Sequence, residues 1–517
     1  MFTEKTLCEV RYMPDITYNQ PEKEEVRNRV LRYAVKSLTT DRSCACCVER
    51  DYVRNLYNVL GIEPSVELKR ELLRIDTAYL NHWERLHDSC VGTKNASDLV
   101  VCYLSGPEPQ NDFNVLTSLG ILPQNIWAFE YDKNMYREAL NKSTSGTYPQ
   151  PRLIRQSIEA FFRDTPRKFD IVYLDACGAI PSSKHALRCV ASMSKYHRLA
   201  SPGILITNFA CPPVVEQDHV DCIAEYLFYK YHPNAKLSHW DQLYLNTQYV
   251  DLRNAIEQNF YAYYGDFITT CLCDVCAVIM PLQRFVNSMM FNNIVENPMP
   301  LSQLSIESMN SLENCSLGRT AMLKELLGSS RNRFTDSLWK EFAGDNPYNE
   351  DASRSLLKVF LLKNYPDVLR NEIREIYDEA ADPKVFYQFL DKPFGGMYLD
   401  FIINQLAYPM HAKTSGIRRF RYRAKETEMF TDVIPLDECR YIYDWLPGMH
   451  QMKQAYRDNS WQDIFRFALD GLVKQRLKYN NEFFFRGSVI DKFESGFEQK
   501  ALAIREVVER RYCYESA

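Results

Sequence analysis

Two acidic residues, Glu130 and Asp175, each follow a short apolar run, at 126–129 and 169–174. In an open α/β sheet, ligands bind outside the carboxyl ends of the strands, where an acid can accept hydrogen bonds from ribose hydroxyls. We favour this role for Glu130 over that of a solvated strand-end acid. Asp175 could orient a reacting group or remove its proton. Alternatively, it could cap the next turn through backbone N–H groups.

A candidate cofactor loop follows the apolar run at 99–104 and begins with Ser105 and Gly106. Glycine lets a ligand approach the backbone closely, because it carries no Cβ. Ser105, Gly106 and Glu108 are therefore candidate cofactor-binding residues.

Two further candidates, Ser157 and Ile158, follow the run at 152–156. The Ser157 hydroxyl could hydrogen-bond the edge of an adenine, and Ile158 could pack on its face. Combined with an acid that binds ribose, this pair predicts a site for a cofactor that contains adenosine.

Strands and helices must alternate to bring these residues together. Apolar runs at 99–104, 126–131, 152–156, 169–174 and 203–209 alternate with helical stretches at 113–119, 133–141, 158–163, 183–199 and 214–231. This alternation predicts βαβ units around a parallel sheet, and therefore an α/β fold. The strands are almost continuously apolar, as expected when helices cover both faces. Two later stretches, 267–272 and 275–280, are predicted to be antiparallel last strands, or one long irregular strand.

In order, spacing and chemistry, this series resembles the class I S-adenosylmethionine-dependent methyltransferases, over about a third of the chain. The resemblance implies a Rossmann-like sheet of seven strands, with S-adenosylmethionine as the cofactor. Gly106 and the neighbouring backbone would then contact the cofactor, Glu130 its ribose, and Ser157 with Ile158 its adenine. Asp175 would face the centre of methyl transfer as the candidate catalytic residue.

The loop and the strand ends differ from the family pattern in ways that leave two functions open. The first loop has one glycine, where the family usually has two or three, and no Asp/Asn-Pro-Pro-aromatic signature follows the fourth strand. One hypothesis is a methyltransferase that acts on a macromolecule such as a nucleic acid. The other is a non-catalytic module that senses S-adenosylmethionine or assembles a protein complex. A nicotinamide-dependent enzyme is disfavoured, because no GxGxxG fingerprint follows residue 104.

The pattern predicts four parts in the 517-residue chain. These are a helical region at 1–95, the Rossmann-like domain at 96–292, a linker at 293–314 and a mostly helical domain at 315–517. Within the first part, residues 65–86 are predicted to form an amphipathic helix. Candidate helices in the last part are 337–343, 352–362, 368–380, 398–406, 461–479 and 497–512, and they could bind a protein partner.

The net charge of -5 excludes a protein that is basic overall, so nucleic-acid binding would need a local patch. The one dense basic stretch contains Arg418, Arg419, Arg421 and Arg423, interleaved with Phe420 and Tyr422. Such a pattern suits phosphate contacts and base stacking in RNA or DNA. It equally describes a strand with one solvated face, which is the commoner case.

The 16 cysteines are scattered, and several lie inside apolar runs. This favours buried free thiols in a reducing cytoplasm over a disulfide framework. Two clusters, Cys44/Cys46/Cys47 and Cys271/Cys273/Cys276, could hold zinc, but we favour buried thiols and predict no metal. No apolar run is long enough to predict a membrane span, and the first residues do not resemble a signal peptide.

Overall fold

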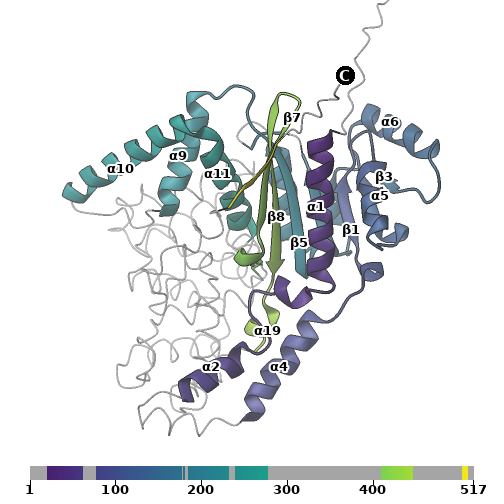
Figure 1. The fold of residues 1–517 in the computed structure, drawn as a ribbon, viewed down its shortest axis with the longest axis horizontal. Helices are drawn as coiled ribbons and strands as arrows, with labels where there is room; N and C mark the ends of the chain where they lie inside the picture. Colours follow the sequence, from purple (N-terminus) through teal and green to yellow (C-terminus); the bar gives the residue numbers. More distant parts are fainter. Residues whose placement is uncertain are drawn as a thin grey trace, which may run out of the picture.

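The computed structural model describes residues 20–61, 77–176, 178–180, 184–231, 239–276, 409–445 and 504–509. They form an α/β fold around one nine-stranded sheet (Figure 1). Its five parallel strands are β1 (Val101–Leu104), β2 (Ile126–Phe129), β3 (Arg152–Ile154), β4 (Phe169–Asp175) and β5 (Leu199–Ala210). Each lies on one of the predicted apolar runs, so the parallel-dominated Rossmann-like sheet is confirmed.

The strand order is β3-β2-β1-β4-β5-β8-β7-β9, and β6 (His411–Ala412) pairs with β8 outside this path. The resemblance implies seven strands, whereas the sheet has nine. Strand β8 (Thr427–Asp437) is antiparallel to β5, whereas β7 (Arg418–Ala424) is antiparallel to β8 and parallel to β9 (Glu506–Val508). The order reverses between β1 and β4, and a sheet of this kind binds its ligand at that switch point.

Helices cover both faces of the sheet. On one face, α1 (Pro21–Leu38) and α5 (Gln110–Ser118) pack on Val101 and Tyr173. The other face carries α7 (Ile158–Asp164), α8 (Lys184–Lys195), α9 (Gln217–Tyr231) and α11 (Phe260–Asp274), which pack on Cys102 and Val172. Successive strand residues thus enter opposite cores, which explains why the strands are apolar on both sides.

The strands predicted at 267–272 and 275–280 are wrong where the structure describes them, because α11 (Phe260–Asp274) is helical. Residues 277–280 lie outside the described part of the chain. In α11 the buried apolar side chains repeat at helical spacing: Tyr264, Phe267, Ile268, Cys271 and Leu272. Spacings of three and four residues place side chains on one face of a helix, and this period outweighed the β-rich composition.

The antiparallel end of the sheet is instead built by β7 and β8, well beyond the predicted domain end at 292. The C-terminal region was predicted to be mostly helical, but its described residues form β6, β7, β8, β9 and one short helix, α19 (Arg440–Tyr443). The predicted helix at 497–512 is wrong at β9, where Val507 and Val508 favour an edge strand. The linker at 293–314 and the other candidate C-terminal helices lie outside the described residues.

The N-terminal region is helical where it is described, with α1, α2 (Tyr52–Gly61) and α4 (Thr77–Val91). Helix α4 overlaps the predicted helix at 65–86, of which 65–76 lies outside the described residues. The remaining described helices include α6 (Lys133–Thr144) and α10 (His239–Gln258). Within the part of the chain that the structure describes, no helix has the length and apolar character needed to cross a bilayer.

Candidate functional site

The candidate site lies at the carboxyl edge of the parallel strands, where the loops after β1, β2, β3 and β4 meet. Strand pairing places the end of β1 beside the end of β2, with Leu104 opposite Phe129. The backbone N–H of Ser105 continues this pairing, since it donates to the carbonyl of Phe129 at 3.0 Å. The candidate cofactor loop and Glu130 are therefore neighbours, as predicted from the strand ends.

The loop after β1 turns at Gly106, which has a φ of +54°. Non-glycine residues adopt this left-handed conformation less readily, so the turn favours a glycine. A Cβ built on Gly106 would meet no atom within 4 Å, which leaves the backbone open to a ligand. Glu108 is tied down, because it accepts hydrogen bonds from Asn111 at 2.9 Å and Lys142 at 3.3 Å.

Glu130 is half-buried just beyond the last residue of β2. Its Oε1 accepts a hydrogen bond from the backbone N–H of Asp132 at 2.8 Å. Burial raises the pKa of Glu130, and this outweighs the opposing effect of the backbone N–H groups of Asp132 and Tyr131. A carboxylate in partial burial gains from further hydrogen-bond donors, which ribose hydroxyls would supply.

Ser157 and Ile158 lie at the start of α7, with Ser157 as its N-cap residue. The Ser157 hydroxyl makes no capping hydrogen bond to the helix, so it is compatible with the predicted contact to an adenine edge. Ile158 is only 1% exposed and belongs to the core packed between α7 and the sheet. Its predicted contact with an adenine face would thus involve very little surface.

Asp175, the candidate catalytic residue, lies in an ion pair. Its Oδ2 is 2.6 Å from the Nζ of Lys23 in α1, and its Oδ1 accepts a hydrogen bond from Asn208 at 2.8 Å. Burial would raise the pKa of Asp175, but Lys23 and Asn208 stabilise the charged form and hold the pKa below its usual value. Asp175 is therefore ionised at neutral pH and engaged by side chains, and its alternative role as a cap of the next turn stays a prediction.

Helix α1 brings a second cation to the same edge. Arg27 lies 2.9 Å from the Oδ1 of Asp112 in the first turn of α5, and both side chains are buried. Lys23 and Arg27 are four residues apart, so they share one face of α1. The sequence analysis missed both residues. Their spacing on the face that also carries Val26 and Val30 is a signal that could have identified them.

A polar network continues from Asp175 to the C-terminal strands. The Asn208 amide donates to Tyr422 at 2.9 Å, and its Oδ1 accepts from Thr431 at 2.8 Å. Asn208, Tyr422 and Thr431 are all at most 2% exposed. The network therefore joins α1, β4 and β5 to the β7–β8 hairpin at the edge where chemistry is expected.

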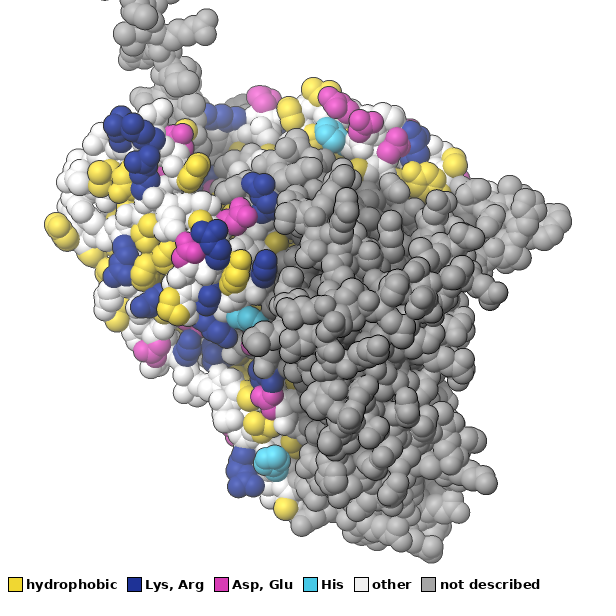
Figure 2. Space-filling view, turned by 180° about the vertical axis from the view of Figure 1, so that it is seen from behind, with side chains coloured by type: hydrophobic (Ala, Val, Ile, Leu, Met, Phe, Trp, Pro, Cys, Tyr) yellow, Lys and Arg dark blue, Asp and Glu magenta, His cyan; other side chains and the backbone are white. Residues whose placement is uncertain are grey.

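The four arginines of β7 have different surroundings. Arg419 is 3% exposed and pairs with Asp266 of α11 at 2.5 Å, so it belongs to the core. Arg421 pairs with Glu428 at 2.8 Å, whereas Arg418 and Arg423 are exposed. The alternation predicted for a strand is present, but α1 and α11 cover its two faces. Figure 2, which views the molecule from behind, shows Lys and Arg side chains interspersed with acidic and apolar ones on the described part of the surface.

The opposite, amino edge of the sheet carries the closest approach to a metal site. Among the described residues, the one group with metal-ligand spacing is Cys47, Asp437 and Cys439, whose ligand atoms lie within 4.8 Å of one another. The Asp437 carboxylate already accepts four hydrogen bonds, from Cys47 N, Cys439 N, the Ser201 hydroxyl and the Tyr441 hydroxyl. These donors satisfy the carboxylate without a metal.

Neither cysteine cluster from the sequence analysis forms a zinc site by itself. Cys44 is exposed, whereas Cys46 and Cys47 are buried. Cys271, Cys273 and Cys276 are buried in and just after α11 as part of the apolar core. Five of these six cysteines are buried, and the absence of zinc from both clusters stays a prediction.

Comparison with known proteins yields little. No protein-family model matches the chain, and no curated protein matches it either. Among solved structures, it is similar to a crystal structure of an S-adenosylmethionine-dependent methyltransferase from Clostridium acetobutylicum ATCC 824, at 20% identity and a TM-score of 0.18. The match covers 30% of this chain and 57% of that one. A TM-score this low is too weak to bear on function, so no family is assigned to the chain.

Proposed function

We propose that the protein is an S-adenosylmethionine-dependent methyltransferase that acts on a macromolecular substrate. The observation that supports this most directly is the pairing of an open, left-handed Gly106 with the half-buried Glu130 at the ends of adjacent strands. They lie next to the β1–β4 switch point, where sheets of this order bind ligands. The Ser157 hydroxyl, which does not cap α7, adds a polar group for an adenine. The residues at this edge therefore fit the proposed cofactor.

When bound, S-adenosylmethionine supplies an electrophilic methyl group on its sulfonium. The protein's own contribution would come from Lys23 and Asp175. A carboxylate with a lowered pKa is a weak base, so removal of a proton by Asp175 is the less favoured of its two predicted roles. Orientation is favoured instead: Asp175, itself held by the Asn208 amide, pairs with the Lys23 ammonium at the strand end, where Lys23 can position a substrate group by hydrogen bonding.

Exposed side chains near the carboxyl edge of the sheet support a macromolecular substrate. Tyr131, next to Glu130, is 73% exposed, and Val214, shortly after β5, is 65% exposed. A macromolecule would cover these apolar side chains. Strand β7 runs parallel to β5, so its last residues, including the exposed Arg423, also reach the carboxyl edge. We propose that Arg423 contacts a nucleic-acid phosphate there, whereas Arg419 does not.

The cofactor assignment is tested by calorimetry on the full-length protein, with S-adenosylmethionine, S-adenosylhomocysteine and NAD titrated separately. We expect micromolar binding of the first two and none of NAD. Glu130→Gln should weaken that binding at least about tenfold, because a charge-assisted hydrogen bond contributes about 1.5–3 kcal/mol. Glu138→Gln, at a half-exposed position of α6, is the matched control. Unchanged binding in Glu130→Gln would refute the ribose contact.

The alternative, a module that binds the cofactor without catalysis, draws support from the Lys23–Asp175 pair, which neutralises the candidate catalytic acid. Incubation with radiolabelled S-adenosylmethionine and mixed RNA, DNA or protein substrates separates the two functions. Transfer of label that Asp175→Asn reduces supports the enzyme. Tight cofactor binding without any transfer supports the module.

A further inference from the structure

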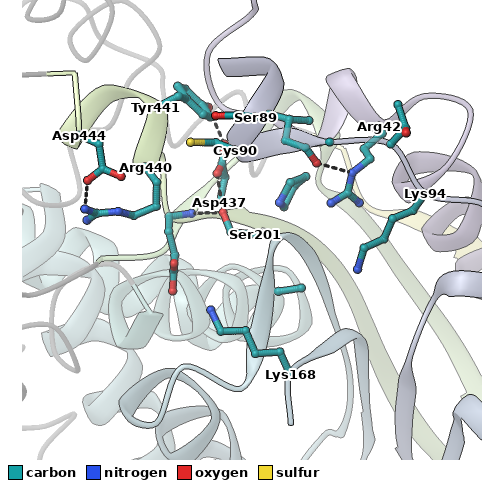
Figure 3. A pocket seen from close by; sticks show the side chains of 16 residues that line it. Arg42, Ser89, Cys90, Lys94, Lys168, Ser201, Asp437, Arg440, Tyr441 and Asp444 are labelled. Carbon is teal, nitrogen blue, oxygen red and sulfur yellow. Dashed lines mark hydrogen bonds and ion pairs between the residues drawn. The ribbon is translucent and has the colours of Figure 1, made fainter. Parts of the chain in front are cut away.

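A pocket of about 530 Å³ opens at the amino edge of the sheet, opposite the proposed cofactor site (Figure 3). Its walls come from the end of α4 and the following loop, the loop before β4, the start of β5 and the segment after β8. The volume is within the range of small-molecule sites in proteins. Proposed methyl transfer at Asp175 makes no use of this pocket, because Asp175 is at the other end of β4.

Arg42 is the most unusual residue of the pocket wall. Its side chain is buried, with 6% of the residue exposed, yet no carboxylate among the described residues forms an ion pair with it. Its guanidinium donates to two backbone carbonyls, from Nε to Val91 at 2.8 Å and from Nη1 to Leu38 at 3.2 Å. Burial lowers the pKa of Arg42, and the more distant Asp170 and Asp437 do not offset this effect. A buried cation in this state gains free energy from an added anion.

The acids around Arg42 are engaged by partners other than Arg42. Each acid already has its own partners: Asp170 pairs with Lys94 at 2.5 Å, Glu438 with His197 at 3.0 Å, and Asp444 with Arg440. Asp437 accepts the four hydrogen bonds described above.

Lys168 is the second cation without an ion pair among the described residues, and it is exposed at the pocket rim. In Figure 3 the charged ends of Arg42 and Lys94 lie on one side of the pocket and that of Lys168 on another. Cations from several directions match the tetrahedral distribution of oxygens on a phosphoryl group better than a planar carboxylate.

We propose that this pocket binds the phosphoryl group of a small ligand through Arg42 and Lys168, with Lys94 shared between the ligand and Asp170. Arg42 supplies a rigid fork of N–H donors, and Lys168 supplies a mobile charge at the entrance. The ligand is either free inorganic phosphate or a small phosphate monoester, which present the same oxyanion.

The test is calorimetric titration of the full-length protein with inorganic phosphate and, separately, with glycerol 3-phosphate, at constant ionic strength. Glycerol 3-phosphate carries no adenosine, so it does not compete for the predicted cofactor site. Saturable binding that weakens with added NaCl is expected for at least one probe. Equal affinities identify the free oxyanion as sufficient, and tighter binding of glycerol 3-phosphate identifies a monoester.

Three variants make the result specific. Lys168→Gln should weaken binding about threefold, as expected for an exposed charge, and Arg42→Lys about tenfold or more. Lys133→Gln, at an exposed position at the start of α6, should leave binding unchanged. If Arg42→Lys fails to fold by circular dichroism, Lys168→Gln alone decides, because its side chain is exposed. The proposal is overturned if neither probe binds up to about 10 mM, or if Lys168→Gln binds as tightly as Lys133→Gln.

Discussion

The two edges of the sheet use buried aspartates in different ways. At the carboxyl edge, Asp175 pairs with one cation, Lys23, beside open loops. At the amino edge, no cation among the described residues pairs with Asp437, which instead accepts hydrogen bonds from four neutral donors, two of them (Cys47 N and the Ser201 hydroxyl) from distant segments. Its bond to the Cys47 N–H alone links residues 390 positions apart. Asp175 is therefore a charged group in a candidate functional site, whereas Asp437 has a structural role.

The largest effect is expected when the Asp437 carboxylate is removed. Asp437→Ala would leave three buried donors and the partly buried Ser201 hydroxyl without this acceptor, which should reduce the free energy of unfolding by about 3–5 kcal/mol. Urea denaturation followed by circular dichroism measures the change. Asp444→Ala is the control, because Asp444 is half-exposed and should cost at most about 1 kcal/mol. If Asp437→Ala reduced the free energy of unfolding by less than about 1 kcal/mol, Asp437 would not have the structural role that distinguishes it from Asp175.

The corresponding change at the carboxyl edge should affect activity more than stability. Asp175→Asn removes the charge that holds Lys23, so we expect methyl transfer to fall about a hundredfold, by analogy with the loss of other positioned polar groups. Lys23→Met should cause a similar loss, and the double variant should lose little more than either single one. Asp164→Asn, at the exposed last residue of α7, is the control. A stability loss as large as that of Asp437→Ala would show that both edges are structural.

A difference in pH dependence sharpens the comparison further. Burial lowers the pKa of His411, beside Asp437 in the β6–β8 pair, to about 3. The unfolded chain protonates this histidine near its ordinary pKa of about 6.5, before the folded protein does. The neutral, buried His411 therefore makes its full contribution to the free energy of unfolding above about pH 6.5. This contribution is lost as the pH falls toward 3.

The loss should approach about 1.4 kcal/mol per pH unit below about pH 5.5. Denaturation curves at pH 7.5, 5.5 and 4.5 measure it. His411→Gln, which keeps a polar group for the Tyr443 hydroxyl at 2.7 Å, should flatten the dependence. An unchanged slope in this variant would assign the pH dependence to other groups.

The smallest effect is expected for the ion pair between Glu108, in the candidate cofactor loop, and Lys142. Glu108 and Lys142 form a partly exposed pair at 3.3 Å, so Glu108→Gln should change the free energy of unfolding by at most about 0.5 kcal/mol. If Glu108 also orders the loop, S-adenosylmethionine affinity should fall a few-fold in calorimetry. Lys36→Gln, at an exposed pair on α1, is the control for stability. If Glu108→Gln greatly lowered the free energy of unfolding, Glu108 would have a structural role. The carboxyl edge would then not differ from the amino edge in this respect.

The sequence predicted the parallel half of the fold because its information is local there. Each strand from β1 to β5 is a short apolar run, and each following helix repeats its apolar side chains with helical period. The carboxyl ends of parallel strands share one edge, so the neighbourhood of Gly106, Glu130, Ser157 and Asp175 also follows from the order of elements.

Only the tertiary structure decided the remaining features, because they depend on contacts between distant segments. The last strands of the sheet come from β7 and β8, after a long intervening stretch, while the nearer β-rich segment forms α11. No local pattern could assign Lys23 to Asp175 or Cys47 to Asp437. The burial of Arg419 likewise required both faces of β7 to be covered. Periodicity determines which face of an element is apolar, whereas packing alone determines which charges meet inside the protein.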